Sequence, residues 1–134
     1  MSEPASAHPH VLAYRRMMEA FNRNDLSTVS ELVAENVEYI VPGKSPLAGH
    51  THDINGLLQM LRRTKELSQG TLRLELESVV ADERHLFVYG RIRADRPGKR
   101  LDSDHCVVFR FENGKIVAGR TVPVDLYEFD AFWG

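Results

Sequence analysis

The residues best suited to chemistry are His105 and the only cysteine, Cys106, which stand together in a strongly apolar segment. A histidine in an apolar pocket can act as an acid or a base near neutral pH. Strand alternation would place His105 on one face with Ser103 and Val107, and Cys106 on the other. A nucleophile needs its base within hydrogen-bond reach, so we do not expect a Cys–His pair. The alternative is a buried His105 bonded to a backbone carbonyl or to Tyr39.

Two tyrosines and a pair of histidines are the other polar candidates. Tyr14 and Tyr39 could present their hydroxyls into a cavity, or be core rings whose hydroxyls reach its rim. His50 and His52 are two residues apart in a segment rich in Gly and Pro, and this spacing suggests metal binding. No aspartate, glutamate or cysteine completes the pattern, so we expect no metal and a role at the surface or cavity rim. No cofactor is expected either.

The segment over residues 101–124 must position His105. It consists of two apolar runs separated by residues 112–115 (ENGK). Asn-Gly between such runs predicts a two-residue hairpin with a type I′ turn, because both central residues need positive φ. His105 lies in the first predicted strand and Gly119 in the second. We therefore expect this hairpin to supply one wall of any site.

Helical periodicity predicts three helices in the first half of the chain. From His10 onwards, apolar residues recur on one face at intervals of three or four. Asp25 or Ser27 can cap a second helix and Asp53 a third. The third helix should end near Gly70, since glycine readily adopts the left-handed conformation that follows a helix.

One predicted strand lies between the second and third helices, and the others follow the third helix. Residues 37–41 (VEYIV) predict a short strand and residues 44–51 (KSPLAGHT) a loop. Over residues 72–77 leucine alternates with charged residues, and residues 85–94 predict a further strand before the hairpin. This order predicts an α+β fold, with three N-terminal helices packed on a curved antiparallel or mixed sheet that encloses a pocket.

The composition fits one globular domain. The 134 residues are 43% hydrophobic and 27% charged, with a net charge of −2. Such a chain can bury a core without disulfides or metals. There is no basic patch for nucleic acid, no signal-peptide pattern at the N-terminus and no apolar run of roughly 18 residues for a membrane. We expect a disordered tail over residues 1–9, a single domain over residues 10–134, and a cytoplasmic location without nucleic-acid or membrane partners.

Several motifs resemble the SnoaL-like branch of the NTF2-like superfamily over roughly residues 10–133. The motifs are NRND at residues 22–25, VPGKSPLAG at 41–49, FRFENGKI at 109–116 and DAFW at 130–133. This group includes polyketide cyclases and ketosteroid isomerases. The resemblance implies a cone-shaped α+β barrel that forms a homodimer through the outer face of its sheet.

The catalytic residues of these relatives do not transfer completely. Ketosteroid isomerase uses an aspartate base with an oxyanion hole of tyrosine and neutral aspartic acid. The resemblance places Val41, Met17 and Val107 at those positions, so this mechanism is not expected. Polyketide cyclase relatives carry a histidine on the penultimate strand, matched by His105, and an aspartate on the last strand, where this chain has Gly119.

We predict a pocket protein that binds a small, largely apolar molecule. If it is an enzyme, the resemblance favours proton transfer of the cyclase or isomerase type, with His105 as acid or base and Tyr39 as helper. Two alternatives stay open: a non-catalytic dimeric binding or scaffold protein, and an epoxide-hydrolase-like enzyme, although Thr121 replaces the catalytic acid there. The ligand contacts expected besides the catalytic pair are Tyr14, Met17, Met18, Val41, Met60, Val107, Phe109, Gly119 and Trp133.

Overall fold

The N-terminal helix starts earlier than the sequence predicted. In the computed structural model, which describes residues 8–134, helix α2 spans Pro9–Asn22. Proline suits the first turn of a helix, where its missing N–H has no partner to lose. The Nδ1 atom of His8 accepts a hydrogen bond from the backbone N–H of His10. The disordered tail predicted over residues 1–9 is therefore wrong at Pro9, and residues 1–7 lie outside the described residues.

Aspartates cap the other helices. Asp25 caps α3 (Leu26–Leu32), and its carboxylate accepts from the Thr28 backbone N–H at 3.1 Å. Asp53 caps α4 (Ile54–Leu67) in the same way, through the Gly56 N–H at 2.8 Å. The three predicted helices are confirmed. The C-terminal segment adds a fourth helix, α5 (Leu126–Trp133), which the sequence interpretation had not assigned.

One mixed sheet holds the six strands found within residues 8–134. Its strand order is β2-β1-β6-β5-β4-β3, with β1 and β6 parallel and the other pairs antiparallel. The strands are β1 (Val33–Val41), β2 (Gly49–Thr51), β3 (Arg73–Ala81), β4 (His85–Arg96), β5 (Lys99–Glu112) and β6 (Lys115–Pro123). The predicted loop over residues 44–51 is wrong at its end, because residues 49–51 pair with the edge of β1. Strand β2 has only three residues, too few for the alternation that predicts a strand.

The β5–β6 hairpin turns as predicted. Asn113 and Gly114 have φ values of 51° and 77°, and Glu112 pairs with Lys115. Positive φ at both central positions is the type I′ turn, which suits the right-handed twist of the flanking strands. Strands β5 and β6 are thereby held in the register that fixes which side chains face inward.

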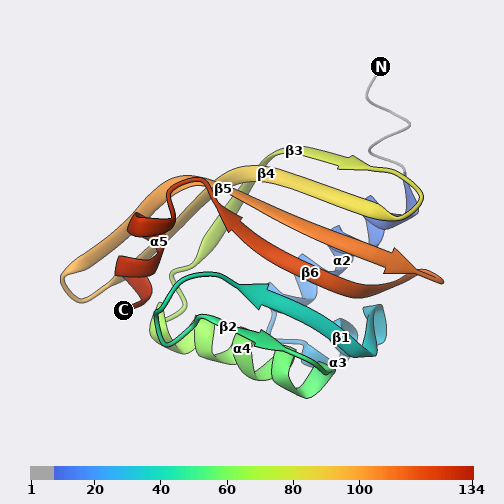
Figure 1. Cartoon of the computed structure of the whole chain (residues 1–134), viewed down its shortest axis with the longest axis horizontal. Helices are drawn as coiled ribbons and strands as arrows, with labels where there is room; N and C mark the ends of the chain where they lie inside the picture. Colours follow the sequence, from blue (N-terminus) through green and yellow to red (C-terminus); the bar gives the residue numbers. More distant parts are fainter. Residues whose placement is uncertain (1–7) are drawn as a thin grey trace.

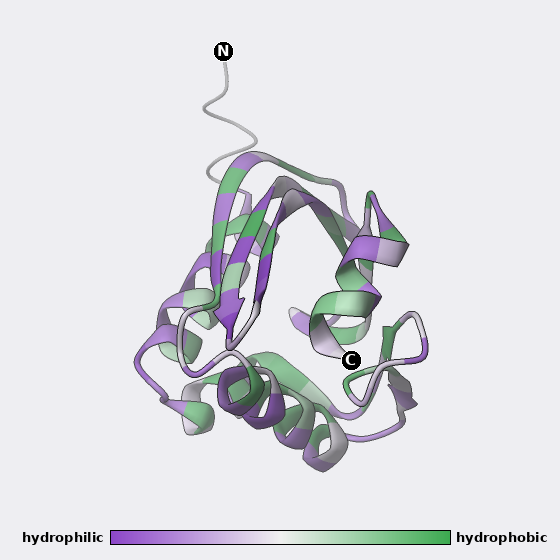
Figure 2. Ribbon diagram, turned by 90° about the vertical axis from the view of Figure 1, so that its left-hand side faces the viewer, coloured by the Kyte–Doolittle hydropathy of each residue, from purple (hydrophilic) through white to green (hydrophobic). Residues whose placement is uncertain are grey.

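The sheet curves around the helices to form a cone (Figures 1 and 2). Helices α2 and α4 lie against its concave side, and α5 lies at the end where β5 and β6 meet it (Figure 1). The concave-face side chains of β1, β4, β5 and β6 are buried with the apolar faces of these helices. No helix within residues 8–134 is long and apolar enough to cross a membrane. The predicted α+β fold with a pocket-forming curved sheet is confirmed.

Candidate functional site

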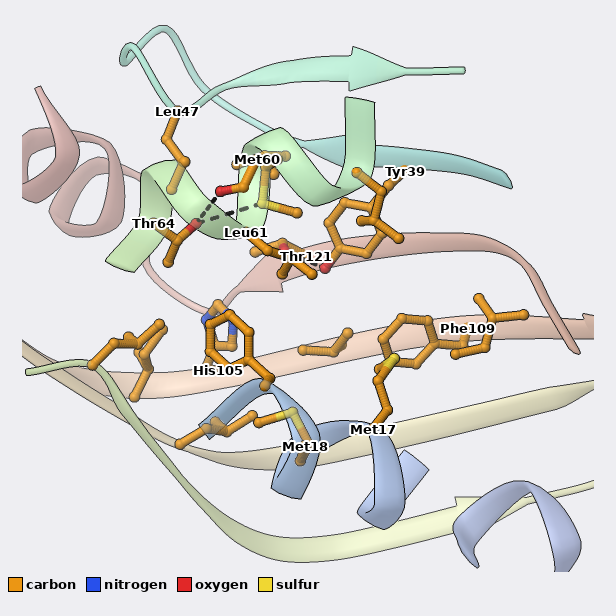
Figure 3. Close-up of a pocket in the computed structure, with 18 of the residues that line it drawn as sticks. Met17, Met18, Tyr39, Leu47, Met60, Leu61, Thr64, His105, Phe109 and Thr121 are labelled. Carbon is orange, nitrogen blue, oxygen red and sulfur yellow. Dashed lines mark hydrogen bonds between the residues drawn. The ribbon is translucent and has the colours of Figure 1, made fainter. Parts of the chain in front are cut away.

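An apolar cavity lies inside the cone, between the concave face of the sheet and the helices (Figure 3). Its volume is about 150 Å³. An apolar cavity of about that size in another protein admits a benzene ring, so the space suits a ring-sized molecule. Among the described residues, the lining contains no Asp, Glu, Lys or Arg. Its polar groups come from Tyr14, Tyr39, Thr64, His105, Thr121 and the Trp133 indole.

His105 is the only imidazole in that lining within residues 8–134. It lies on the concave face of β5, with 4% of its surface exposed, and stacks on Phe129 with ring centroids 5.6 Å apart. Its Nδ1 atom is buried and has no hydrogen-bond partner in the described part of the chain. Burial lowers the pKa of His105 to about 4. The ring is therefore neutral at pH 7, with one nitrogen as donor and the other as acceptor, and cannot serve as a general acid there.

Tyr39 pairs with Thr121 rather than with His105. The Tyr39 hydroxyl lies 2.6 Å from Thr121 Oγ1, across the parallel β1–β6 pair. Burial raises the pKa of Tyr39 to about 12, although the hydrogen bond to Thr121 acts in the opposite direction. The helper role of Tyr39 stays a prediction, and its hydroxyl would act together with that of Thr121, because the pair uses only one of its two O–H groups. Thr121, first interpreted only as the position of a missing acid, is the residue that pairs with the Tyr39 hydroxyl.

Gly119 does not line the cavity, contrary to prediction. A Cβ atom at this position would lie 2.7 Å from Cδ1 of Tyr39 and 2.8 Å from Cδ1 of Phe109. Its inward direction was correctly predicted, but the two aromatic rings cover it. Glycine is required here because any side chain would displace these rings from the cavity wall.

The other predicted contacts all face the cavity. The lining includes Tyr14, Met17, Met18, Val41, Met60, Val107, Phe109 and Trp133. Their contact with a ligand stays a prediction. Burial, and next the neighbouring Tyr39, raise the pKa of Tyr14 far above its ordinary value, so it stays protonated. The sequence interpretation missed Thr64 on α4, whose hydroxyl donates to the Met60 carbonyl at 2.8 Å. Phe129 on α5 also lines the cavity.

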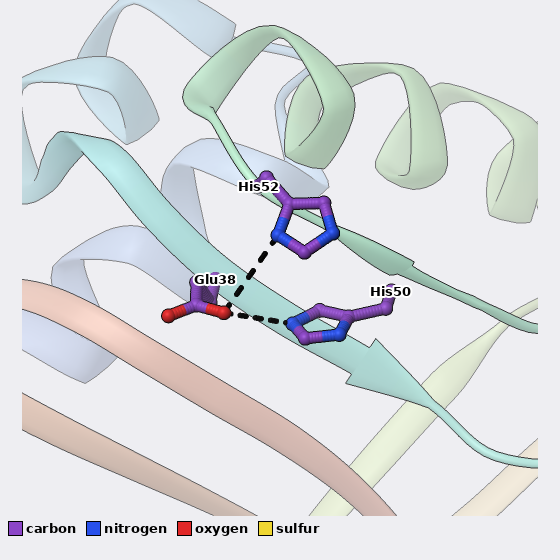
Figure 4. Close-up of side chains that lie close together, drawn as sticks. All are labelled: Glu38, His50 and His52. Carbon is purple, nitrogen blue, oxygen red and sulfur yellow. Dashed lines mark hydrogen bonds and ion pairs between the residues drawn. The ribbon is translucent and has the colours of Figure 1, made fainter.

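A second group of polar side chains lies outside the cavity. His50, His52 and Glu38 approach one another at the paired ends of β1 and β2 (Figure 4). The expectation that no carboxylate completes the histidine pair is therefore wrong. Glu38 was missed because it is twelve residues before His50, and only the β1–β2 pairing brings the two together.

The curved mixed sheet and the apolar cavity define a small α+β pocket protein. A family model described as the SnoaL-like domain matches residues 14–119. The chain belongs to the SnoaL-like family. An uncharacterised protein of Mycobacterium tuberculosis is 33% identical to it over 121 residues, which cover 89% of this chain and 92% of that protein.

Solved structures share the fold over nearly the whole chain. Bal32a, from a soil-derived mobile gene cassette, is 34% identical with a TM-score of 0.89, covering 96% of this chain and 99% of Bal32a. An NTF2-like protein of unknown function from Burkholderia pseudomallei is 22% identical with a TM-score of 0.80, covering 94% and 98% of the two chains. The SnoaL-like, NTF2-like assignment made from the sequence motifs is confirmed.

Proposed function

We propose that this protein binds a small, largely apolar molecule, about the size of one six-membered ring, that carries a polar group. The observation that carries this proposal is an apolar cavity whose only imidazole, among the described residues, is buried with an unpartnered nitrogen. A buried polar atom without a partner costs about 1–3 kcal/mol. A ligand hydroxyl or carbonyl that meets the imidazole would recover part of that cost.

The polar group of the ligand should lie at the end of the cavity next to α5. His105 and Trp133 both line the cavity, and His105 Nδ1 and Trp133 Nε1 are both buried without a partner among residues 8–134. The rest of the wall is formed mostly by aliphatic, methionine and phenylalanine side chains. This asymmetry supports an amphipathic ring, with its apolar edge toward α2 and α4.

Proton abstraction from such a ligand is the second candidate function. The neutral His105 is an acceptor at pH 7, and the paired hydroxyls of Tyr39 and Thr121 offer a donor in the same cavity. Binding is favoured over catalysis for two reasons. A base with a pKa of about 4 is far from the value near the working pH that proton transfer needs. The described lining also has no carboxylate to assist it, and no Asp-Arg-Asp set for epoxide hydrolysis.

Benzene and phenol form a matched pair that tests the binding proposal. Both fit a cavity of this size, and they differ by one hydroxyl. We expect phenol to bind about tenfold more tightly than benzene, the ratio that about 1.4 kcal/mol provides. In His105→Leu the preference should disappear while benzene binding remains. Affinities would be measured by NMR titration of the labelled protein.

Cavity filling supplies the control for location. Val107 faces the cavity and Val108 faces the opposite side of the same strand. Val107→Phe should abolish the binding of both compounds, whereas Val108→Phe should leave it intact. The amide NMR spectrum of each variant would show whether it is folded. Equal affinities of benzene and phenol for the unaltered chain, or no binding of either, would contradict the proposal.

A homodimer through the outer sheet face is the association we propose. Two rows of cross-strand neighbours support it: Val80 beside Phe87, and Tyr89 beside Cys106 and then Val122. Val80, Phe87, Tyr89 and Val122 are exposed, so together they form an apolar stripe on the convex side. Contiguous apolar patches of this kind mark association surfaces.

Sedimentation velocity at micromolar concentration tests the dimer. Phe87→Asp and Val122→Lys should shift the chain from dimer to monomer. Tyr127→Asp is the matched control, because Tyr127 is exposed but lies on α5, outside the stripe. A monomeric unaltered chain would refute the dimer without affecting the cavity proposal.

A further inference from the structure

We propose that Glu38, His50 and His52 bind a divalent transition-metal ion, with Zn²⁺ as the ion to test. The three side chains converge on one point at the edge of the sheet (Figure 4). Their ligand atoms all lie within 4.8 Å of one another. This site is separate from the cavity, whose lining includes none of the three residues.

The donor distances suit tetrahedral zinc. Ligand atoms about 2.0–2.2 Å from a tetrahedral ion lie about 3.3 Å from each other. Here Glu38 Oε1 is 2.9 Å from His50 Nε2 and 3.7 Å from His52 Nδ1. These two distances bracket the required value. Small rotations of exposed side chains would therefore complete the coordination without a change in the backbone.

Backbone pairing holds the three residues in place. Tyr39 pairs with Thr51 and Ile40 with His50, so the next step of this antiparallel register sets Glu38 opposite His52. His50 and His52 are two residues apart, and alternation gives them the same face. Just beyond His52, the Asp53 cap fixes the start of α4. Two of the three ligands thus lie on paired strands, and His52 lies in the short link between β2 and the Asp53 cap.

The geometry of the cluster is what points to a metal. Both imidazoles approach the same Oε1 atom of Glu38, and their ring centroids are 4.2 Å apart, so three ligand atoms from three side chains face one point. A metal ion takes two neutral imidazoles and one carboxylate, and leaves a position for water.

The ligand set also predicts selectivity. Imidazole nitrogens suit zinc, copper and nickel, whereas Mg²⁺ and Ca²⁺ prefer oxygen ligands. A bound ion would tie the three-residue strand β2 to β1. It would also restrain the connecting loop over residues 42–48, which contributes Leu47 to the cavity wall.

Calorimetric titration of the untagged full chain with zinc chloride tests the proposal. We expect one zinc ion per chain and no response to magnesium chloride. Glu38→Gln, His50→Asn and His52→Asn should each weaken binding by at least about tenfold, since even outer-shell partners of a metal site account for 10–100-fold. All three side chains are exposed, so the variants should fold, and circular dichroism would confirm it.

His85→Asn is the matched control. His85 also faces a carboxylate, with Nδ1 3.5 Å from Asp82, but it is not part of the Glu38 cluster. Its substitution should leave zinc binding unchanged. Zinc should raise the thermal midpoint of the unaltered chain and not that of Glu38→Gln. Absence of zinc binding, or zinc binding that persists undiminished in Glu38→Gln and His50→Asn, would overturn the proposal.

Discussion

The cavity and the β1–β2 edge use histidine in opposite ways. Inside, His105 is alone, almost fully buried and unpartnered at Nδ1, and burial lowers its pKa to about 4. At the edge, His50 and His52 are exposed and share one carboxylate oxygen. The same ring is therefore a neutral hydrogen-bonding group in one place and a candidate metal ligand in the other. Environment, rather than residue type, decides the chemistry.

The largest expected difference between interior and surface concerns the aromatic residues of α5. Trp133 is 1% exposed and packs edge-on against Phe132, whereas Tyr127 is 89% exposed. Trp133→Ala should lower the free energy of unfolding by about 3–5 kcal/mol. Tyr127→Ala should change it by less than about 0.5 kcal/mol. Urea denaturation monitored by circular dichroism would measure both, and similar losses would show that α5 does not close the cavity wall.

Acid should distinguish His105 from the exposed histidines. Its folded-state pKa of about 4 lies below the ordinary value of 6.5, so between these values the unfolded chain binds more protons. The contribution of the neutral His105 ring to the free energy of unfolding is therefore fully present above pH 6.5 and is lost as pH falls toward 4. The loss amounts to about 3 kcal/mol at pH 4, since one pKa unit corresponds to about 1.36 kcal/mol.

His105→Leu isolates the pH-dependent contribution of His105 to stability, because all other groups titrate in both proteins. Relative to the unaltered chain, the variant should gain about 3 kcal/mol in the free energy of unfolding on going from pH 7 to pH 4. Urea denaturation at the two pH values would measure it. A difference that does not change with pH would mean that His105 is not buried as a neutral ring.

The hydroxyl pair in the cavity should show a smaller effect. Tyr39→Phe leaves Thr121 Oγ1 buried without the partner it has at 2.6 Å. This should cost about 1–3 kcal/mol in the free energy of unfolding. Adding Thr121→Val should restore much of the loss, because removing both polar partners is nearly neutral. A double variant as unstable as the sum of both single variants would rule out this coupling.

The cluster of Glu38, His50 and His52 at the sheet edge should contribute least to the free energy of unfolding in the absence of metal. Exposed ion pairs contribute little, so Glu38→Gln should change the free energy of unfolding by less than about 0.5 kcal/mol in a chelator. Thermal denaturation with and without the chelator would separate this term from any metal effect. A large loss in the chelator would show that the ion pair itself holds β2 in place.

Local patterns predicted the elements well. The Asn113-Gly114 turn, the Asp53 cap and the inward face of His105 follow from turn chemistry, capping and strand alternation. The start of α5 also had a local signal, which the sequence interpretation did not use, because Asp125 precedes an apolar run and accepts from the Glu128 N–H. These features depend only on residues near one another in the chain.

Features that depend on distant pairing could not be predicted. The parallel contact of β1 with β6 sets Tyr39 beside Gly119 and joins its hydroxyl to Thr121. The pairing of β1 with β2 brings Glu38 to the histidines. No turn motif or residue spacing in the sequence predicts either pairing. The Tyr39–Thr121 pair in the cavity and the approach of Glu38 to the two histidines therefore became visible only in the folded chain.

The central claim is that the cavity takes up an amphipathic ring, and methionine methyl groups report on it most directly. Met17, Met18 and Met60 line the cavity from α2 and α4. With ¹³C-labelled methionine methyl groups, titration with phenol should produce saturable chemical-shift changes at all three positions, and none in Val107→Phe. Methyl signals that stay unchanged at saturating phenol would contradict the account.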